Sequence, residues 1–314
     1  MTDKGRNCMN LLDLKETFPK INILLDEALA HYSYTKTGGP ADALVFPENI
    51  DQVRQILDWA TQEEVPLTIL GNLSNLIVRD GGIRGIVMIL TQMNAITIED
   101  NRITAMSGAK IIDVSRAALE ASLTGLEFAC GIPGSTGGAV FMNAGAYGGE
   151  MVDLPLRVVT VDRKNQMHEY TTDMCDFSYR HSIFQENDDI ILSVELELTP
   201  GDSKQIKDTM DHLTFLRESK QPLEYPSCGS VFKRPPGHYT GKLIQDAGLQ
   251  GKRIGGAEIS KKHAGFIVNI AGATATDYED MIHFIQETIW ELKQVRLERE
   301  VRIIGYPPGK NKNS

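Results

Sequence analysis

A short turn in the last third of the chain carries a thiol and a hydroxyl two positions apart. It reads PSCGSVFKRP over residues 226–235, with Cys228 and Ser230 on either side of Gly229. A thiol acts as a nucleophile once it is ionised, whereas a hydroxyl can donate a proton if a developing negative charge lies within hydrogen-bond reach. The turn alone does not decide which of the two side chains does chemistry.

Two glycine-dense turns have the composition of an anion-binding site. The first, GNLSN at residues 71–75, directly follows the predicted strand PLTIL, and the second, GIPGSTGG at residues 131–138, continues into NAGAYGG at residues 143–149. Glycines let backbone N–H groups face a pyrophosphate with no Cβ in the way. Short polar donors accompany the glycines at Ser74, Asn75, Ser135 and Thr136.

Polar side chains at three other places also suggest chemistry. Arg180 lies among aromatic residues in FSYRHS, Lys233 follows Ser230 in the opening turn, and Glu300 precedes a short final strand in EVRIIG. Taken singly, Arg180, Ser230 and Glu300 are each more readily explained as ordinary surface or turn residues. No cluster of His, Asp and Glu has the spacing of metal ligands, so we expect no metal, and we expect His181 and His263 to be structural or supporting residues.

Length and charge restrict the class of protein. A chain of 314 residues predicts two or three domains, and its formal net charge of −10 argues against binding to nucleic acid or to an anionic membrane. No apolar run approaches the roughly 18–20 residues of a membrane span, and the first residues lack the apolar core of a signal peptide. The four widely spaced cysteines are typical of reduced thiols. We therefore expect a cytoplasmic globular protein.

Hydrophobic periodicity predicts a mixture of helices and strands. Helices are expected over residues 9–30, 50–65, 111–125 and 206–220, and a last helix is expected to begin at a capping box formed by Thr276 and Glu279. Residues 189–200 alternate between apolar and polar, as in a sheet with one wet face. Without a sustained βαβα alternation the fold class is α+β. The chain has no strand followed by GxGxxG and no GxxxxGK[ST], so we expect neither a Rossmann fold nor a P-loop ATPase.

The joint order of these motifs resembles the UDP-N-acetylenolpyruvoylglucosamine reductase family, from about Tyr34 to Gly305. The matching segments also include TGGPA at residues 37–41 and KLIQDAGLQGKRIGGAEISKKHAGFIVN at residues 242–269. Leu73 stands where the family usually has a second glycine, so the backbone there must adopt a conformation that a leucine tolerates.

The short segment after Arg180 is similar to the form of the family that lacks an inserted tyrosine loop. In that form a substrate lid must come from elsewhere. Tyr147 and the region around His238 and Tyr239 are our candidates for such a lid.

The resemblance implies an α+β fold with a two-lobed FAD-binding region of the p-cresol methylhydroxylase type and a C-terminal substrate domain. We expect a first lobe at residues 1–85, to which residues 301–314 return, a second lobe at residues 86–204, and a substrate-binding domain at residues 205–300. The oligomeric state is not predicted.

The resemblance also implies a peptidoglycan-synthesis flavoenzyme, and with it roles in cell shape and cell division. NADPH, as co-substrate, reduces a non-covalent FAD, and the flavin N5 then delivers hydride to the enolpyruvyl group of UDP-N-acetylglucosamine enolpyruvate. The enolate is protonated to give UDP-N-acetylmuramate. The resemblance assigns Ser230 as the proton donor, Arg180 as the partner of the substrate carboxylate, and Glu300 as a group that polarises that carboxylate, either as a carboxylic acid or through a water. Cys228 is left without a redox role.

The same resemblance implies which residues bind FAD. The expected set is Tyr34, Thr37, Gly38, Leu70, Gly71, Asn72, Ser74, Asn75, Leu76, Gly131, Ile132, Pro133, Gly134, Ser135, Thr136, Gly138, Asn143, Ala144 and Gly145.

Two alternatives remain open at this point. One is an oxidase or dehydrogenase of alcohols or sugars with the same cofactor fold, many of which attach the flavin covalently to His or Cys. The other is a nucleotide-sugar-binding protein without catalysis.

Overall fold

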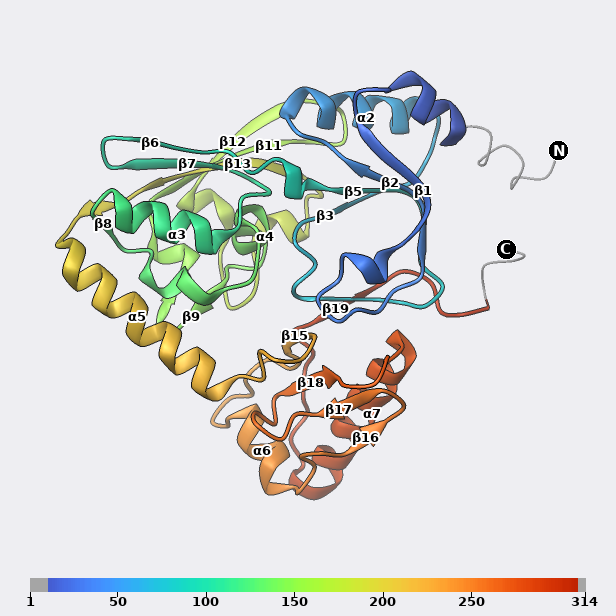
Figure 1. Ribbon diagram of the computed structural model, residues 1–314, viewed down its shortest axis with the longest axis vertical. Coiled ribbons are helices and arrows are strands. Elements are labelled where there is room, and N and C mark those ends of the chain that lie inside the picture. The colour runs from blue at the N-terminus through green and yellow to red at the C-terminus, as the bar shows by residue number, and fades with distance from the viewer. Residues whose placement is uncertain (1–10, 310–314) are drawn as a thin grey trace. The chain divides into compact units, whose positions relative to one another are not determined.

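The computed structural model describes residues 11–309, which divide into two compact units (Figure 1). Within that range, unit 1 comprises residues 11–25, Ala43–Asn72 and Gly85–Arg217. Unit 2 comprises Asp26–Asp42, Leu73–Arg84 and residues 218–309. The chain therefore passes from one unit to the other several times. The three-domain division expected from the resemblance stays a prediction.

The larger sheet of unit 1 has five antiparallel strands in the order β12-β11-β13-β7-β6. Helices α3 (Ile111–Glu120) and α4 (Thr136–Phe141) contact its central strands β7 and β13, and their apolar residues share one core with the sheet. Val194 and Leu196 of β13 are fully buried, as the predicted alternation requires. The strands are β6 (Ile96–Glu99), β7 (Arg102–Met106), β11 (Leu156–Val161), β12 (Met167–Thr171) and β13 (Ile190–Glu197).

A second sheet has four strands in the order β1-β2-β5-β3, with β3 parallel to β5. Helix α2 (Ile50–Gln62) begins at Asn49, whose side chain accepts a hydrogen bond from Gln52 N over 3.0 Å. The helix buries the predicted apolar face of Val53, Ile56, Leu57 and Ala60 in a core of unit 1. The strands are β1 (Asn22–Ala28), β2 (Pro40–Phe46), β3 (Leu67–Leu70) and β5 (Ile83–Ile89).

The helix expected over residues 9–30 is wrong for most of its length. Helical backbone covers residues 11–17, and Asn22–Ala28 forms strand β1; positions 9 and 10 of the prediction lie outside the described residues. Pro19 explains the change, because a proline lacks the backbone N–H and disfavours helical conformation in the residue before it. Ile21 and Ile23, two positions apart and both buried, then follow the period of a strand.

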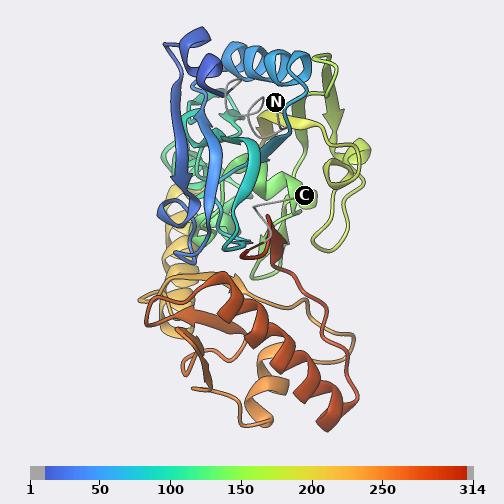
Figure 2. The same cartoon turned by 90° about the vertical axis from the view of Figure 1, so that its right-hand side faces the viewer.

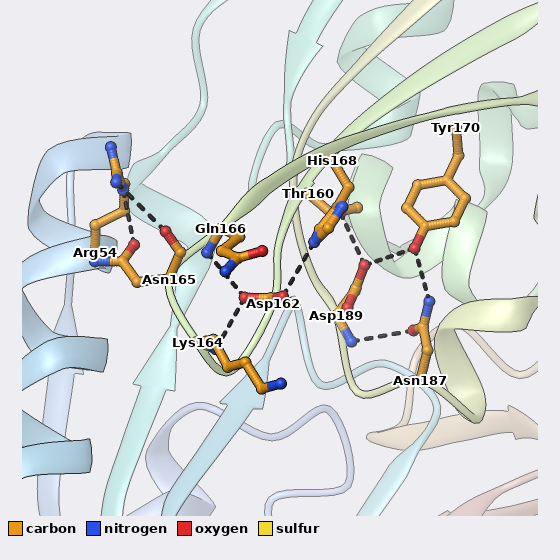
Figure 3. A network of polar contacts seen from close by, with 10 residues as sticks. All are labelled: Arg54, Thr160, Asp162, Lys164, Asn165, Gln166, His168, Tyr170, Asn187 and Asp189. Carbon is orange, nitrogen blue, oxygen red and sulfur yellow. Dashed lines mark hydrogen bonds and ion pairs between the residues drawn. The ribbon is translucent and has the colours of Figure 1, made fainter.

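A polar network stiffens the hairpin between β11 and β12 in unit 1 (Figure 3). The Asp162 carboxylate accepts hydrogen bonds from the N–H groups of Lys164 and Gln166, each over 2.8 Å. The hydrogen bond from Gln166 is the largest cause that lowers the pKa of Asp162. At the tip, Asn165 accepts from Arg54 Nε of α2 over 2.7 Å, so the hairpin of one sheet is tied to the helix that covers the other.

A sheet of four antiparallel strands and a long helix form the main part of unit 2, seen from the side in Figure 2. The order is β15-β18-β17-β16, and β15 at its edge carries the PSCGS turn. Helix α7 (Ala275–Lys293) buries Tyr278, Met281, Ile282, Ile285 and Ile289 in the core of this unit. The strands are β15 (Ser227–Ser230), β16 (Arg253–Ile254), β17 (Ala257–Ile259) and β18 (Phe266–Asn269), and α6 covers Thr240–Asp246.

The start of α7 differs from the prediction by two residues. Thr274, not Thr276, is the N-cap, and it forms a capping box with Asp277. Both pairs have the same spacing, but Thr276 is occupied elsewhere, because its hydroxyl and its N–H both donate to the Asp80 carboxylate. An acidic side chain at a helix N-terminus is favourable, so Asp80 supports the same helix end.

Short elements connect these parts. Helix α5 covers Ser203–Lys220, so the predicted helix starts three residues earlier than expected. Strand β19 (Arg302–Ile304) pairs in parallel with β4 (Leu76–Val78) in unit 2. Two-residue strands are β8 (Leu123–Thr124), β9 (Gly145–Ala146), β10 (Gly149–Glu150) and β14 (Thr199–Pro200), and the 3-10 turns are η1 (Leu29–His31), η2 (Leu90–Gln92), η3 (Glu127–Gly131), η4 (Met151–Asp153), η5 (Thr172–Cys175) and η6 (Ile183–Gln185).

Candidate active site

The two glycine-dense turns, about sixty residues apart in the sequence, touch each other in unit 1. The Asn72 amide Nδ2 donates to the Pro133 carbonyl over 2.7 Å. A Cβ added at Gly71 would overlap Ser135 Oγ, so only glycine permits this approach. The predicted FAD-binding residues of these turns that belong to unit 1 therefore form one surface of glycines and neutral donors. That composition fits the pyrophosphate of a dinucleotide.

Internal hydrogen bonds hold the second turn in shape. Ser135 Oγ accepts from Gly138 N over 3.3 Å at the start of α4. The Thr136 N–H and hydroxyl both donate to the Ala109 carbonyl, over 2.7 and 2.9 Å, and this side chain is fully buried. Thr136 thus fixes the backbone that its neighbours present, and its direct contact with FAD remains a prediction.

The predicted FAD-binding residues of unit 2 form a second group. The Tyr34 N–H donates to the Leu73 carbonyl over 3.4 Å, so the turn after Tyr34 lies against the end of GNLSN. Behind it, the hydroxyls of Thr35 and Thr37 are hydrogen-bonded to each other at 2.8 Å and are buried. Gly38 adopts a φ of +129°, which side chains rarely tolerate. Glycine and small hydroxyls therefore shape this turn too.

Leu73 has left-handed backbone. Its φ is +49°, in the region that glycine enters freely and leucine enters at an energetic penalty. The side chain is only 3% exposed. The family's usual glycine at this position is thus explained by the backbone, and in this chain burial of the leucine side chain opposes the strain.

Ser230 ends the edge strand β15 after an irregularity. Gly229 has a φ of +78°, and the pairing of β15 with β18 shifts register between Ser227 and Ser230. Such a bulge redirects the side chains that follow it. Ser230 is exposed, whereas Cys228, two residues earlier, is only 2% exposed in the core of unit 2. Burial raises the pKa of the Cys228 thiol to about 12, so it stays protonated at neutral pH.

Glu300 lies beside the Ser230 segment in the same unit. Its N–H donates to the carbonyl of Val231, the residue after Ser230, over 2.8 Å, and Phe232 and Arg299 form a bridge alongside. On its other side, the Glu300 carbonyl accepts from Asn75 Nδ2 over 3.3 Å. In unit 2, Glu300 therefore lies between the segment that contains Ser230, through the backbone of Val231, and the predicted FAD-binding residue Asn75, through its side-chain amide.

Arg180 occupies a strained turn in unit 1. Ser178 and His181 exchange two backbone hydrogen bonds around Tyr179 and Arg180, and the φ of Arg180 is +59°. Its guanidinium donates to the carbonyls of Asn143, over 3.4 Å, and Gly145, over 3.2 Å. The side chain is 18% exposed, and Glu150 lies 3.9 Å away. Backbone strain of this kind is concentrated at functional positions.

The Asn143 side chain forms hydrogen bonds with the turn that contains Arg180 and with its neighbours. Its Nδ2 donates to the Ser178 carbonyl and to Glu150 Oε2, each over 3.0 Å, and its Oδ1 accepts from Val152 N over 3.0 Å. The residue is 1% exposed and its φ is +40°. Asn143 therefore positions the Arg180 turn. Nothing in the sequence distinguished this from the predicted contact with FAD, which remains a prediction.

The two lid candidates are both exposed aromatic residues. Tyr147 is 45% exposed at the tip of the β9–β10 hairpin in unit 1. Tyr239 is 65% exposed in unit 2, with the Arg234 guanidinium 3.9 Å above the centre of its ring. Both rings are exposed, as a substrate lid requires, and the assignment stays a prediction.

The histidines make internal contacts. His263 Nδ1 accepts a hydrogen bond from Gly265 N over 3.1 Å, and burial lowers its pKa. His181 lies 3.5 Å from Glu186. Within residues 11–309, no group of three or more His, Cys, Asp or Glu side chains is arranged to hold a metal ion. In the same range, no helix is both long and apolar enough to cross a membrane.

Comparison with known proteins covers nearly the whole chain. The FAD binding domain family matches residues 41–169, and the family of the C-terminal domain of UDP-N-acetylenolpyruvoylglucosamine reductase matches residues 221–304. The chain is 58% identical over 285 residues to the UDP-N-acetylenolpyruvoylglucosamine reductase of Latilactobacillus sakei, covering 91% of this chain and 94% of that protein. It is 54% identical over 295 residues to the reductase of Staphylococcus aureus, covering 94% and 96%.

The chain belongs to the UDP-N-acetylenolpyruvoylglucosamine reductase family. The crystal structure of the family member from Thermus caldophilus superposes with a TM-score of 0.78 at 32% identity, covering 91% of this chain and 99% of that one. The predicted family and the α+β fold class with an FAD-binding region of the p-cresol methylhydroxylase type are confirmed. As a member of this family the chain is an FAD-dependent oxidoreductase of peptidoglycan synthesis, so catalysis distinguishes it from a mere nucleotide-sugar-binding protein.

Proposed function

We propose that this reductase converts UDP-N-acetylglucosamine enolpyruvate into UDP-N-acetylmuramate, with NADPH as the electron donor and FAD as the carrier. The observation that carries the proposal is the backbone pairing of the Glu300 segment with the Ser230 segment, over 2.8 Å at Val231, in a chain of this family. A proton donor and a group that polarises a carboxylate are the side chains that this reduction requires next to each other.

The glycine-dense turns would hold the cofactor. The turns at Gly71 and Ser135 supply neutral donors to its pyrophosphate, which suits a chain with a formal net charge of −10. The turn from Tyr34 to Gly38 would lie near the flavin ring. When bound, FAD would accept a hydride from NADPH and would then supply a hydride to the terminal carbon of the enolpyruvyl double bond.

Arg180 binds the substrate carboxylate in this proposal. A guanidinium stays charged and can hold a carboxylate through two parallel hydrogen bonds. The carbonyls of Asn143 and Gly145 fix the guanidinium in orientation, so little freedom is lost when the substrate binds. As negative charge spreads from the reacting carbon into the carboxylate, the arginine binds the transition state more tightly than the substrate.

Ser230 donates the proton to the carbon next to the carboxylate. A serine hydroxyl is a weak acid, so it needs the developing carbanion within hydrogen-bond reach. Glu300 polarises the same carboxylate, either as a carboxylic acid or through a bridging water. Cys228 takes no part, because its thiol is buried and its pKa is raised to about 12.

A spectroscopic experiment tests the proposal. The purified protein should have the absorbance of an oxidised flavin, and acid precipitation should release that flavin from the polypeptide. Under anaerobic conditions NADPH should bleach the flavin band, and the enolpyruvyl sugar nucleotide should restore it with formation of the lactyl product. A flavin that stays bleached after the sugar nucleotide is added contradicts the proposal.

A further inference from the structure

Asn269, the last residue of β18 in unit 2, uses both ends of its side-chain amide inside the protein. Its Nδ2 donates to the Thr35 carbonyl over 2.9 Å, and its Oδ1 accepts from the Ala273 N–H over 2.8 Å. Both hydrogen bonds are buried, and the residue is 8% exposed. A flipped amide would turn its oxygen toward a carbonyl and its nitrogen toward an N–H, so the side chain has one favourable orientation.

Thr35 lies in the middle of the turn that we expect near the flavin ring. The buried hydroxyls of this turn bond within the turn. Ser33 Oγ donates to the Thr37 carbonyl over 2.7 Å and accepts from the Thr37 N–H over 3.1 Å, and Thr35 Oγ1 lies 2.8 Å from Thr37 Oγ1. These contacts fix the shape of the turn, whereas the hydrogen bond from Asn269 connects it to the sheet of unit 2.

The backbone of Asn269 connects to the strand that carries Ser230. Its N–H donates to the Pro226 carbonyl over 2.9 Å, at the start of the PSCGS turn. Strands β15 and β18 then pair, with Ser230 opposite Phe266. One residue therefore contacts the expected flavin turn through its side chain and the Ser230 segment through its main chain, although these two segments are far apart in the sequence.

We infer that Asn269 is a positioning residue, which holds the turn from Tyr34 to Gly38 in place relative to the strand that carries Ser230. The inference rests on the proposed function, in which hydride and proton arrive at adjacent carbons of one double bond. A misplacement of about 1 Å between reacting groups can slow a reaction by ~10²-fold. Hydrogen bonds from one residue to both segments limit such a displacement.

Asn269→Asp breaks the connection to the turn and keeps the others. The aspartate still offers an oxygen to the Ala273 N–H, but it presents an oxygen to the Thr35 carbonyl, where a donor is required. Asn269→Ser introduces no charge and is too short to reach both partners. The matched control is Asn101→Asp, since Asn101 Nδ2 donates to the Leu198 carbonyl over 3.1 Å in unit 1.

Titration of the apoprotein with FAD and with ADP tests the inference, because ADP lacks the riboflavin part of the cofactor. In both Asn269 variants the dissociation constant of FAD, measured by quenching of flavin fluorescence, should rise roughly 10- to 100-fold. The dissociation constant of ADP, measured by calorimetry, should stay the same. Asn101→Asp should alter neither constant.

The two half-reactions provide a second readout. At saturating FAD, oxidation of the reduced flavin by the enolpyruvyl substrate should slow by ~10²-fold in the Asn269 variants. Reduction of the flavin by NADPH should slow much less, because that half of the reaction needs no proton from Ser230. A residue that only stabilises the fold would affect both halves alike.

Other outcomes overturn the inference. They are an unchanged affinity for FAD in both variants, an equal loss of affinity for FAD and for ADP, equal slowing of the two half-reactions, and failure of both variants to fold. The titrations need no turnover. If the variants lose affinity for FAD alone while the natural protein fails to reduce the enolpyruvyl substrate, the role of Asn269 at the flavin turn stands and the proposed reaction fails.

Discussion

The backbone N–H of Glu300 donates to the Val231 carbonyl over 2.8 Å, which places the glutamate beside the segment that ends in Ser230. The two residues are about seventy positions apart in the sequence, and the contact joins the edge of the sheet of unit 2 to the segment leading into β19. Asn75 Nδ2 donates to the Glu300 carbonyl from the end of the first glycine-dense turn. A small shift of this segment would therefore disturb the predicted cofactor turn and a proposed catalytic residue together.

Replacement of Glu300 by glutamine should slow only one half of the reaction. Because the backbone hydrogen bonds of residue 300 do not need the carboxyl group, the fold and flavin binding should persist. Oxidation of the reduced flavin by the enolpyruvyl substrate should slow by ~10²–10³-fold, as when one preorganised electrostatic partner is lost. Stopped-flow absorbance measures both halves separately. Glu298→Gln is the control, since Glu298 is exposed and pairs with Lys233; equal effects of the two variants would contradict the assignment.

Replacement of Asn143 by alanine should destabilise unit 1 and weaken the Arg180 site. The Val152 N–H and the Ser178 carbonyl would lose a buried side-chain partner in part-buried hydrogen bonds. We expect a loss of about 1–3 kcal/mol in the free energy of unfolding, measured with urea. In protein that is still folded, the KM for the enolpyruvyl substrate should rise while flavin reduction by NADPH stays the same. Asn165→Ala, on the remote β11–β12 hairpin, should leave that KM unaltered.

The buried thiols should resist alkylation in the native state. The pKa of Cys228 and that of Cys175 are both raised to about 12 by burial, whereas Cys130 is only half-buried. At pH 8, iodoacetamide should modify Cys130 far faster than the other two, as mapped by mass spectrometry of peptides. Fast modification of Cys228 in folded protein would contradict the burial argument and would favour a reactive thiolate at this position.

The raised pKa of a buried thiol also predicts how the free energy of unfolding changes with pH. In the unfolded chain a cysteine ionises near pH 8.5, but in the folded protein Cys228 remains protonated up to about pH 12. Between these values the unfolded state binds fewer protons, so the free energy of unfolding falls as the pH rises. Cys228→Ala should make this decline less steep between pH 8.5 and 10 in urea titrations, and an unaltered slope would contradict the burial argument.

Leu73 allows strain and burial to be separated. Leu73→Gly removes a left-handed leucine, a gain of about 1–2 kcal/mol, and also a buried side chain, a loss of about 2–5 kcal/mol. Leu73→Ala loses the side chain and keeps the strain. The free energy of unfolding should therefore decrease in the order Leu, Gly, Ala. A glycine variant more stable than the natural protein would show that strain outweighs burial.

Much of the fold could be predicted because local patterns agreed with the final structure. The apolar face of α2 and the alternation along β13 recur among the buried residues. The errors came from competing local signals. Pro19 ends a helix that periodicity alone extends to residue 30, and Asp80, far away in the sequence, binds Thr276 and leaves the N-cap to Thr274.

The candidate site was predictable only as a set of motifs. The sequence and the family resemblance indicated the glycine-dense turns, Arg180, Ser230 and Glu300. They did not reveal that the Asn143 side chain bonds the Arg180 turn and the neighbouring Glu150, because a buried asparagine and a ligand-binding one look alike in a glycine-rich segment.

The most direct test of the central claim is the oxidation half-reaction of Ser230→Ala, followed anaerobically by stopped-flow absorbance of the flavin. We predict that NADPH reduces this variant at nearly the natural rate and that oxidation by UDP-N-acetylglucosamine enolpyruvate slows by ~10²–10⁴-fold. In Cys228→Ala, both reduction of the flavin by NADPH and its oxidation by the enolpyruvyl substrate should proceed at nearly the natural rates. Rapid oxidation of the flavin in Ser230→Ala, together with slow oxidation in Cys228→Ala, would contradict the account. The Cys228 thiol would then be assigned as the proton donor.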